Sequence, residues 1–566
     1  MPAPDPEFVD RLRSDLSLPR VACSLLCVRG FHEPEDARGF LRPFLDDLSS
    51  PEALPGIPRA VDRIVEALER EETILVHGDY DVDGISGTAL LTRWLRRLGG
   101  RVEPFVPDRL RDGYDFGDGG LRAAREAGAG LVVTVDCGIR AHEAVNRARS
   151  EGLDVVVTDH HQPGDTLPAA VAVVNPRRGD ASASPGPLSG TGVVYKLCQA
   201  LAEGPLARER GASGRELHGH LDLVALATVA DLVPLTGENR TLVRFGLKAL
   251  RQTSKVGLRA LMEAAEVAPD TVDAGKVGFV LAPRINAAGR IGDARSALRL
   301  LLTSDPGEAA SLAEELEETN RARRDVDRRV LDEALALLAD SYDPDRDYGV
   351  VLASRDWHPG VIGIVASRLV ERIHRPVVLV ALDGDTGRGS ARSIAGFHLA
   401  RALESCEEHL VRYGGHARAA GLDVRASRLD DFRAAFAEEA RRHLADTPLR
   451  PELKIDLEVE LEETDEEVHR LVEYFGPFGI GNPRPVFLAR GVRPAGPARV
   501  VGSGHLKLQI SQGKRRLEAI GFGLADRIRP DRVAEAALDV VFQLRENHYR
   551  GRTTLQARLL DIRPSE

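Results

Sequence analysis

Short apolar runs alternate with helix-like stretches over much of the chain. The runs TILVH at 73–77, GLVVTVD at 130–136 and LDVVVTD at 153–159 have the length of strands, and segments such as AHEAVNRARSEG at 141–152 separate them. This alternation predicts parallel strands joined by crossover helices. We therefore expect an α/β fold whose first sheet begins near residue 70.

The pattern changes twice further along. The stretch 306–341 has no proline or glycine after its start, and its alternating charges predict one long helix that connects two domains. A strand-like GVVLAS at 349–354 and an amphipathic VIGIVASRLVERI at 361–373 then begin a second α/β unit. After residue 450, alternating segments such as KIDLEVEL at 454–461 predict strands at hairpin spacing and a small β-barrel of the OB kind.

These changes predict five successive parts. They are an N-terminal helical segment (1–55), a parallel-sheet catalytic domain (56–305), a connector helix (306–345), a smaller α/β domain (346–450) and an OB-like nucleic-acid-binding domain (451–566).

Composition excludes several classes of protein. A hydrophobic fraction of 43% and a charged fraction of 29% are typical of globular domains. The five cysteines are scattered and form no Cys-x-x-Cys, which argues against a disulfide framework and a thiolate zinc site. The sequence has no apolar run of about 18 residues and no signal-peptide pattern, so we expect a cytoplasmic protein without a membrane partner.

Charge is distributed unevenly around a net value of −11. Residues 481–566 carry sixteen basic and eight acidic side chains, whereas 451–480 carry two and ten. Aromatic residues accompany the basic tail, and a basic groove with aromatic rings holds single strands without reading bases. We expect at least half of these rings to fill the barrel core instead: Phe475, Phe478, Phe487, His505, Phe522, His548 and Tyr549.

The strongest chemical signal is HGDYDVDG at 77–84. It places the carboxylates of Asp79, Asp81 and Asp83 at alternate positions beside His77, directly after a predicted strand. So much like charge requires compensation, and a divalent cation is the simplest source of it.

Further ligands follow other predicted strands and one helix. Asp136 ends one strand, Asp159 ends the next and is followed by His160 and His161, and Asp231 follows an apolar helical run. Because ligands gather at the carboxyl ends of parallel strands, these side chains are expected to converge. A mixture of carboxylate and imidazole favours two Mn²⁺ or Mg²⁺ ions over Zn²⁺.

The motifs HGDYDVDG (77–84), VDCG (135–138), DHH (159–161) and ATVADLVPL (227–235) resemble the metal motifs of the DHH phosphoesterase superfamily, and GGHARAAG (414–421) resembles the phosphate-binding motif of its DHHA1 domain. The chain is most similar to the RecJ single-strand-specific DNA exonuclease family. The segments VPDRLRDGYDFG (106–117), APRINAAGRIGDA (282–294), SRDWHPGVIGIVASRL (354–369) and FGIGNPRPVF (478–487) carry that resemblance. Asp115-Phe116 depart from the family pattern.

The resemblance implies roles for individual residues. One metal would be held by residues among His77, Asp79, Asp81 and Asp136, with the choice between His77 and Asp79 open. The other would be held by Asp83, Asp136, His160 and Asp231, so that Asp136 bridges. Asp136 and His161 are the catalytic candidates, His161 as an acid or a phosphate-binding group. The substrate-binding candidates are Arg109, Arg284, Asn286, Ser390, Arg392, Gly414, Gly415 and His416.

The resemblance also implies the activity. We expect a single-strand-specific 5′→3′ DNA exonuclease that releases mononucleotides by two-metal phosphodiester hydrolysis in DNA repair and recombination. Single-stranded DNA is the expected partner, with single-strand-binding protein and a helicase as further partners. The alternatives are a phosphodiesterase for short oligonucleotides or cyclic dinucleotides, and a catalytically inactive single-strand-binding relative.

Overall fold

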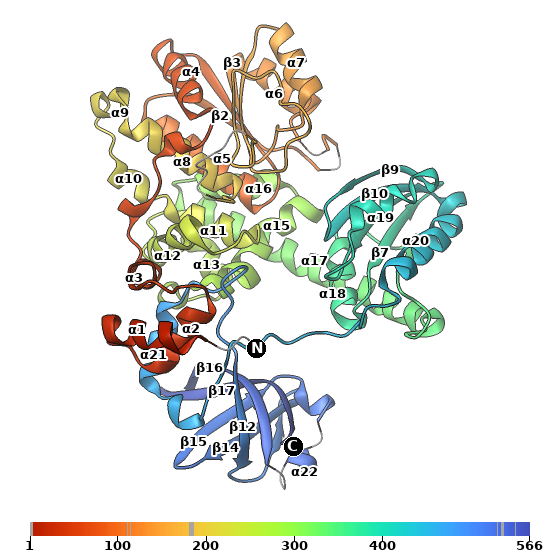
Figure 1. Cartoon of the computed structure of the whole chain (residues 1–566). Helices are drawn as coiled ribbons and strands as arrows, with labels where there is room; N and C mark the ends of the chain where they lie inside the picture. Colours follow the sequence, from red (N-terminus) through yellow and green to blue (C-terminus); the bar gives the residue numbers. More distant parts are fainter. Residues whose placement is uncertain are drawn as a thin grey trace.

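The computed structural model describes residues 4–109, 111–113, 115–179, 186–528, 530–533, 537–549 and 551–565, with the backbone alone at 531, 532 and 549. Figure 1 shows three lobes around a central layer of helices. Two of the lobes contain an α/β sheet each, and the third contains an all-β sheet beside the N-terminal helices.

The first lobe is a parallel sheet covered on both faces. Its strands lie in the order β2-β1-β3-β4-β5. They are β1 (Thr73–Gly78), β2 (Arg101–Phe105), β3 (Ala129–Val135), β4 (Asp154–Thr158) and β5 (Ala172–Val174). The helices α4 (Ile57–Glu69), α5 (Val82–Arg97) and α8 (Gly190–Glu203) cover one face, and α6 (Asp118–Ala127) and α7 (His142–Ser150) cover the other. Ile74 and Val76 face the first group and Leu75 the second, because side chains alternate along a strand.

The central layer follows α8 and leads into a long connector. It consists of α9 (Pro205–Glu209), α10 (Gly214–His218), α11 (Leu221–Ala230), α12 (Gly237–Arg251), α13 (Val256–Ala264), α14 (Ala274–Lys276), the π-helical turn η4 (Val277–Leu281), α15 (Ala282–Ile291) and α16 (Ala294–Leu302). The connector α17 (Pro306–Ser341) occupies the stretch for which the sequence predicts one long helix. Asp305 caps it, since its carboxylate accepts a hydrogen bond from the Glu308 N–H at 2.7 Å. The helix packs on α13, α15 and α16 and then on the second lobe.

The second lobe is a mixed sheet with helices on both faces. Its order is β6-β7-β8-β10-β9, and only β6 and β7 are parallel. The strands are β6 (Val350–Ser354), β7 (Val377–Asp383), β8 (Thr386–Arg392), β9 (Leu410–Gly415) and β10 (Ala419–Arg425). The helix α18 (Ile362–Ile373) packs with α17 on one face, and α19 (Leu399–Glu404) and α20 (Leu429–Leu444) pack on the other.

The third lobe is a ring-like sheet, as the predicted barrel requires. It comprises β11 (Leu457–Glu458), β12 (Phe487–Pro494), β13 (Arg499–Val501), β14 (His505–Gln512), β15 (Arg515–Gly521), β16 (Leu538–Tyr549) and β17 (Arg552–Pro564), with α21 (Glu466–Tyr474) and α22 (Pro530–Val533) beside it. Pairing of β12 with both β16 and β14 closes the ring. Closure leaves fewer strand edges exposed.

The N-terminal helices belong to the same body as this ring. The helices α1 (Pro6–Leu16), α2 (Arg20–Val28) and α3 (Pro34–Leu41) share one apolar core with it, in which Leu12 and Leu25 join Phe475 and Phe487. Figure 1 shows α1 and α2 next to α21. The sequence predicts helices here but gives no sign that the two ends of the chain pack together.

Arg240 of α12 fixes this body to the central layer. Its guanidinium donates to the carbonyls of Tyr474 and Gly476, each at 2.8 Å, and lies 4.0 Å from the centroid of the Phe40 ring. Within the described ranges, no helix is long and apolar enough to cross a membrane.

Candidate active site

The acidic motif after β1 forms the turn that starts α5. Asp81 is the N-cap of this helix, and one of its carboxylate oxygens accepts hydrogen bonds from the Asp83 and Gly84 N–H groups at 2.9 and 3.1 Å. The other oxygen has no part in the cap. The sequence folds this way because an aspartate at the N-cap satisfies N–H groups that have no partner inside the helix.

Three groups of side chains lie close enough to hold a cation, among the residues that the structure describes. They are Asp79–Asp81–Asp136, Asp83–His160–Asp231 and Asp136–His160–His161, and within each group the candidate ligand atoms lie within 4.8 Å of one another. Asp136 and His160 each belong to two groups. The carboxyl ends of β1, β3 and β4 and the C-terminal end of α11 therefore meet at one place.

His160 and Asp136 meet in a way that fits a cation between or beside them. The Nδ1 of His160 lies 3.1 Å from the Leu188 carbonyl, which assigns the proton to Nδ1 and leaves a lone pair on Nε2. That Nε2 lies 3.1 Å from Oδ1 of Asp136, and neither atom has a hydrogen-bond partner among the described residues. A buried lone pair that faces a carboxylate oxygen is compensated by a shared metal ion.

Burial and like charge raise the pKa of Asp79, Asp81, Asp136 and Asp231. For Asp136 the desolvation is the larger cause, and the charges of Asp83, Asp81 and Asp231 add to it. Burial followed by repulsion from Asp81 likewise raises the pKa of Asp79 well above its usual value. Bound cations would offset the repulsion among these buried carboxylates. Oxygen and imidazole donors suit Mn²⁺ or Mg²⁺.

The N-terminal end of α8 contacts two carboxylates of this cluster. Both carboxylate oxygens of Asp83 accept backbone hydrogen bonds there, from the Gly190 and Thr191 N–H groups at 2.7 Å. Gly190 also abuts Asp136, since a Cβ on Gly190 would lie 2.6 Å from that of Asp136. Asp136 itself adopts φ = 62°, a conformation that costs energy and that occurs at functional sites.

His161 is oriented by Asp159. Its Nδ1 lies 2.8 Å from Oδ1 of Asp159, whose carboxylate also accepts the His160, His161 and Ile139 N–H groups. Burial disfavours the imidazolium, but this hydrogen bond and the negative charge of Asp159 outweigh it and raise the pKa of His161 to about 9. The His161 side chain remains 35% exposed.

His77 lies apart from these groups. Its ring packs between Phe105 and Phe116, with both ring centroids 5.3 Å away, and Nδ1 lies 3.6 Å from the Cys137 Sγ. Burial lowers its pKa to about 4. None of the cation-binding groups found among the described residues includes it.

The second lobe presents its predicted donors around β8 and β9. Arg392 donates to the Ser390 Oγ at 3.0 Å, and Gly363 at the start of α18 lies beneath both, because a Cβ there would come within 2.9 Å of each. Burial and the charge of Arg109 lower the pKa of Arg392. Arg392 therefore lies within electrostatic range of a residue of the first lobe.

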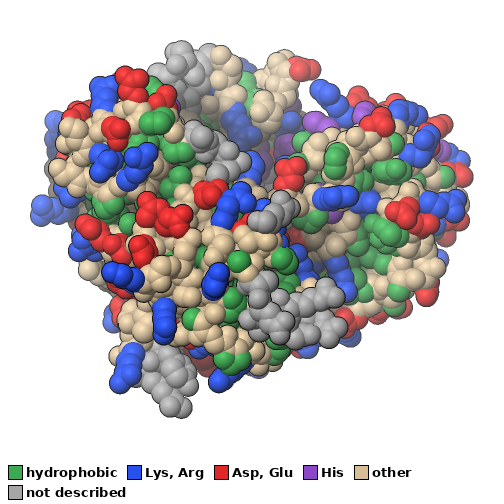
Figure 2. Space-filling view, turned by 60° about the horizontal axis from the view of Figure 1, so that its bottom comes forward, with side chains coloured by type: hydrophobic (Ala, Val, Ile, Leu, Met, Phe, Trp, Pro, Cys, Tyr) green, Lys and Arg blue, Asp and Glu red, His purple; other side chains and the backbone are tan. Residues whose placement is uncertain are grey.

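The glycine motif lies within electrostatic range of residues of the first lobe. Gly414 and Gly415 end β9, and Gly415 has φ = 146°, which an L side chain rarely adopts. His416 follows them, and partial burial together with the positive charges of His161, Arg140 and Arg177 lowers its pKa. The GGHARAAG segment of the second lobe thus lies within electrostatic range of the DHH segment of the first. Figure 2 shows a recess between the two sides of the molecule, with Lys, Arg and His side chains along it.

The arginines of the first lobe take different positions. Arg109 lies 5.3 Å from the ring centroid of Tyr80 and within electrostatic range of Asp79. Arg284 is engaged elsewhere, in an ion pair with Glu317 of α17 at 2.5 Å and a hydrogen bond to the Val280 carbonyl. Asn286 accepts a hydrogen bond from the Val82 N–H at 3.1 Å, which ties α15 to the acidic turn.

Several residues of the site are not among those that sequence reasoning singled out as ligands or donors. Burial and the charges of Arg109, Arg323 and Arg392 lower the pKa of Arg290 to about 10, so Arg290 lies within electrostatic range of these arginines. Asp159 orients His161 through a hydrogen bond, and Gly190, which has no side chain, leaves room for Asp136. The strand-end position of Asp159 is a signal in the sequence, whereas nothing in the local pattern around Gly190 reveals its neighbour.

The predicted aromatic residues of the barrel divide between core and surface. Phe475 and Phe487 are fully buried, whereas Phe522 is 53% exposed with the Arg558 guanidinium 5.3 Å from its centroid. Phe478 is partly buried, with the Arg484 guanidinium 4.2 Å from its centroid. His505 is half-buried and packs on Phe522, while His548 is exposed. The side chain of Tyr549 lies outside the described residues.

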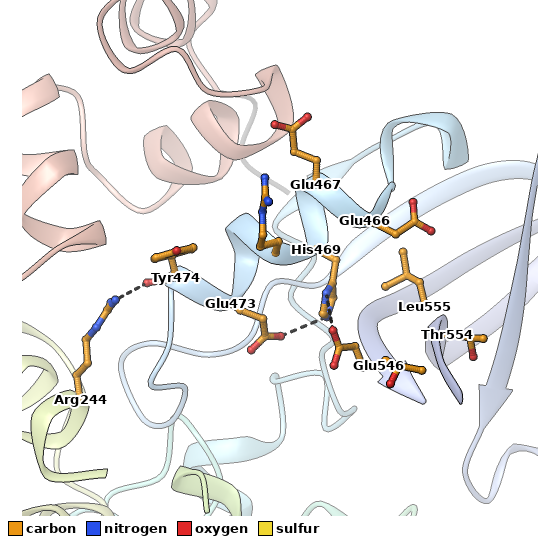
Figure 3. Close-up of a pocket in the computed structure, with 11 residues that line it drawn as sticks. Arg244, Glu466, Glu467, His469, Glu473, Tyr474, Glu546, Thr554 and Leu555 are labelled. Atoms are coloured by element: carbon orange, nitrogen blue, oxygen red, sulfur yellow. Dashed lines mark hydrogen bonds and ion pairs between the residues drawn. The ribbon is translucent and has the colours of Figure 1, made fainter. Parts of the chain in front are cut away.

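A separate cavity of about 660 Å³ lies between α21, α12 and the β16–β17 hairpin. Figure 3 shows that Glu466, Glu467, Glu473 and Glu546 line it around His469. Hydrogen bonds from His469 and Arg484 outweigh the effect of burial and lower the pKa of Glu473 to about 2. The acidic lining makes this cavity unsuited to a phosphate backbone.

Comparison with known proteins agrees with this geometry. Residues 73–228 match the model of the DHH family N-terminal domain, 347–442 match the DHHA1 domain and 455–561 match the RecJ OB domain. Fold and site thus define a DHH phosphoesterase with its DHHA1 partner domain.

Relatives that match most of the chain identify its family within this class. The single-stranded-DNA-specific exonuclease RecJ of Escherichia coli (strain K12) is 38% identical over 528 residues, 90% of this chain and 91% of that protein. The protein of the same name from Bacillus subtilis (strain 168) is 35% identical over 570 residues, 100% of this chain and 70% of the relative. The crystal structure of RecJ from Thermus thermophilus with Mn²⁺ superimposes with a TM-score of 0.84 at 34% identity and covers 100% of this chain and 79% of that one. The structure of the same protein with Mg²⁺ superimposes with a TM-score of 0.78 at 33% identity and covers 100% of this chain and 78% of that one. The chain belongs to the RecJ family.

Proposed function

We propose that this chain degrades single-stranded DNA from the 5′ end and releases mononucleotides by metal-dependent phosphodiester hydrolysis. Relatives that cover nearly the whole chain are named single-stranded-DNA-specific exonucleases, and a metal-dependent exodeoxyribonuclease is the activity that the family membership carries. The observation that carries the proposal is the convergence of three candidate cation-binding groups at the carboxyl ends of β1, β3 and β4.

The cations would be held by two sets of ligands. Asp79, Asp81 and Asp136 fit one ion, and Asp83, His160 and Asp231 fit the other, with Asp136 placed to contact both. We favour Asp79 over His77, because the His77 ring is enclosed by Phe105 and Phe116. Bound Mn²⁺ or Mg²⁺ would neutralise charge on the phosphoryl oxygens and make water acidic enough to act as the nucleophile.

The remaining residues bind and orient the strand end. His161, held by Asp159 through Nδ1, offers its other ring nitrogen to a phosphate oxygen or to the leaving 3′ oxygen. Arg109, Arg290 and Arg392 would hold the terminal phosphates, and Ser390, His416 and the N–H groups of Gly414 and Gly415 would complete that wall. Asn286 acts through the backbone of the acidic turn and Arg284 through the connector helix, so both are positioning residues.

The ring-like sheet would hold the strand beyond the cleft. Phe522 is 53% exposed beside the exposed Arg558, and aromatic rings next to cations suit single strands because bases stack on them without base recognition. By family resemblance we also propose a cytoplasmic role in DNA repair and recombination, with single-strand-binding protein and a helicase as partners.

The test uses matched single-stranded and blunt duplex DNA labelled at either end, with Mn²⁺, with Mg²⁺ and with chelator. We expect the 5′ label of the single strand to appear first as a mononucleotide, only with metal. Unpairing a duplex costs about 1.4 kcal/mol per base-pair step, so duplex should be attacked slowly. Equal rates on both substrates, or a preference for dinucleotides, would favour the small-substrate phosphodiesterase.

A further inference from the structure

Phe279 and Leu232 are the two most exposed large apolar side chains in the described part of the chain, at 88% and 67%. Their neighbours are buried: Val277 and Leu281 on either side of Phe279 are at most 1% exposed. Phe279 and Leu232 are therefore two large apolar side chains that face solvent and lie outside the apolar core.

Both residues lie on segments next to the candidate ligand Asp231, one in sequence and one through helix packing. Leu232 directly follows the candidate ligand Asp231 and has φ = 58°, which is unusual for a leucine. Phe279 lies in the π-helical turn η4, which packs against the C-terminal end of α11, since a Cβ on Gly278 would lie 3.5 Å from Val229. π-Helical turns occur often at functional sites.

The surface continues from this pair toward the ring-like sheet. The Leu235 N–H donates to the Ile480 carbonyl at 2.7 Å, and the Ile480 side chain is 52% exposed. Asp273, four residues before Val277, lies within electrostatic range of Arg545 of β16. A strand that leaves the metal cleft for the basic sheet therefore meets an apolar stretch before it meets cations.

We propose that Phe279 and Leu232 hold a base of the single-stranded substrate by stacking and apolar contact. This contact contributes to the affinity for the strand next to the metal site. This inference rests on the proposed function. An exposed aromatic ring on an element that packs against α11, next to a candidate metal ligand, suits single-stranded nucleic acid, because every base has an apolar face and stacking does not depend on sequence. A paired base has no free face to offer.

The experiment compares Phe279→Ala, Phe279→Trp and Leu232→Ala with the matched control Phe44→Ala, whose side chain is 62% exposed. Phe44 lies in the N-terminal segment, apart from the metal groups. Steady-state hydrolysis is measured with Mn²⁺ on a single strand of about 20 nucleotides, and on a series in which one abasic site is moved along the strand. We expect Phe279→Ala to raise KM about five- to a hundredfold, the range that one base–aromatic stack provides, with kcat much less affected. Phe279→Trp and Phe44→Ala should stay close to the wild type.

The abasic series separates stacking from a general disturbance. At one position, the abasic site should raise KM for the wild type and have no further effect on Phe279→Ala, because both changes remove the same contact. Additive effects at every position, or an unchanged KM in Phe279→Ala, would overturn the inference while leaving the nuclease activity in place. A wild-type protein that does not degrade single strands at all would instead refute the proposed function, and this inference with it.

Discussion

Gly190 lies directly against Asp136: a Cβ on this glycine would sit 2.6 Å from the Cβ of the aspartate. The same N-terminal turn of α8 gives its N–H groups to both carboxylate oxygens of Asp83. One residue without a side chain therefore fixes the separation of two candidate metal-ligating carboxylates that are 53 positions apart.

Gly190→Ala should reduce hydrolysis about 10- to 100-fold while the fold is retained, because a displacement of about 1 Å at a catalytic group has an effect of this size. Activity and the unfolding temperature are compared with Gly214→Ala, since a Cβ on Gly214 of α10 would meet no described atom within 4 Å. Equal activity of the two variants would show that Asp136 tolerates the shift.

Asp136→Asn should abolish hydrolysis, with a loss of at least about 100-fold, the scale for removing charge stabilisation at a developing oxyanion. Asparagine tolerates the positive φ of this position, so the protein should remain folded. The variant should also lose most of the rise in unfolding temperature that Mn²⁺ gives the wild type. Normal activity with unchanged metal content would remove Asp136 from the site.

Arg392→Ala and His416→Ala should raise KM more than they lower kcat, if these residues hold the strand end equally in the ground and transition states. Arg441→Ala is the control, because Arg441 pairs with Glu438 on α20, which covers the other face of this sheet from α18. A fall in kcat without a change in KM would assign the two residues to the chemical step instead.

Arg558→Ala should weaken binding of single-stranded DNA and reduce the slope of log K against log salt by about 0.7, the value for one phosphate contact on a single strand. Titrations at several salt concentrations give the slope, and Arg11→Ala on α1, where Arg11 pairs with Glu33, is the control. If the slope is unchanged, Arg558 only covers the Phe522 ring.

Glu473→Gln should destabilise the protein at neutral pH, by at most about 1 kcal/mol because this side chain is half-exposed. The folded-state pKa of about 2 lies below the unfolded value, so the carboxylate stabilises the fold above about pH 4.3, and this contribution disappears as the pH falls toward 2. Unfolding curves of the variant and the wild type should therefore converge in acid. Glu467→Gln, in the same helix and lining the same cavity, should show a smaller difference at pH 7.

The order of the elements and the identity of the candidate ligands can be predicted from local sequence patterns. Apolar runs of strand length, each ending in aspartate or histidine, predict a parallel sheet with its polar side chains along one edge, and β1, β3 and β4 end in this way. Local patterns suffice for this, because strand period, helix caps and breakers act over a few residues.

The surroundings of neighbouring candidate residues depend on the tertiary fold, and the sequence does not reveal them. His77 and Asp79 are two residues apart, and the sequence leaves both open as ligands. In the fold, the His77 ring is enclosed by Phe105 and Phe116, while Asp79 meets Asp81 and Asp136. Likewise Arg284 lies in a family-like motif but is engaged by Glu317 of α17.

The packing of the chain ends was also beyond the sequence. The helices of residues 6–41 pack into the core of the ring-like sheet, and Gly190 lies against Asp136, because burial of apolar surface brings together segments that are far apart along the chain. Periodicity shows which face of an element is apolar. It does not show which other face will cover it, and that choice depends on the shapes of all the elements at once.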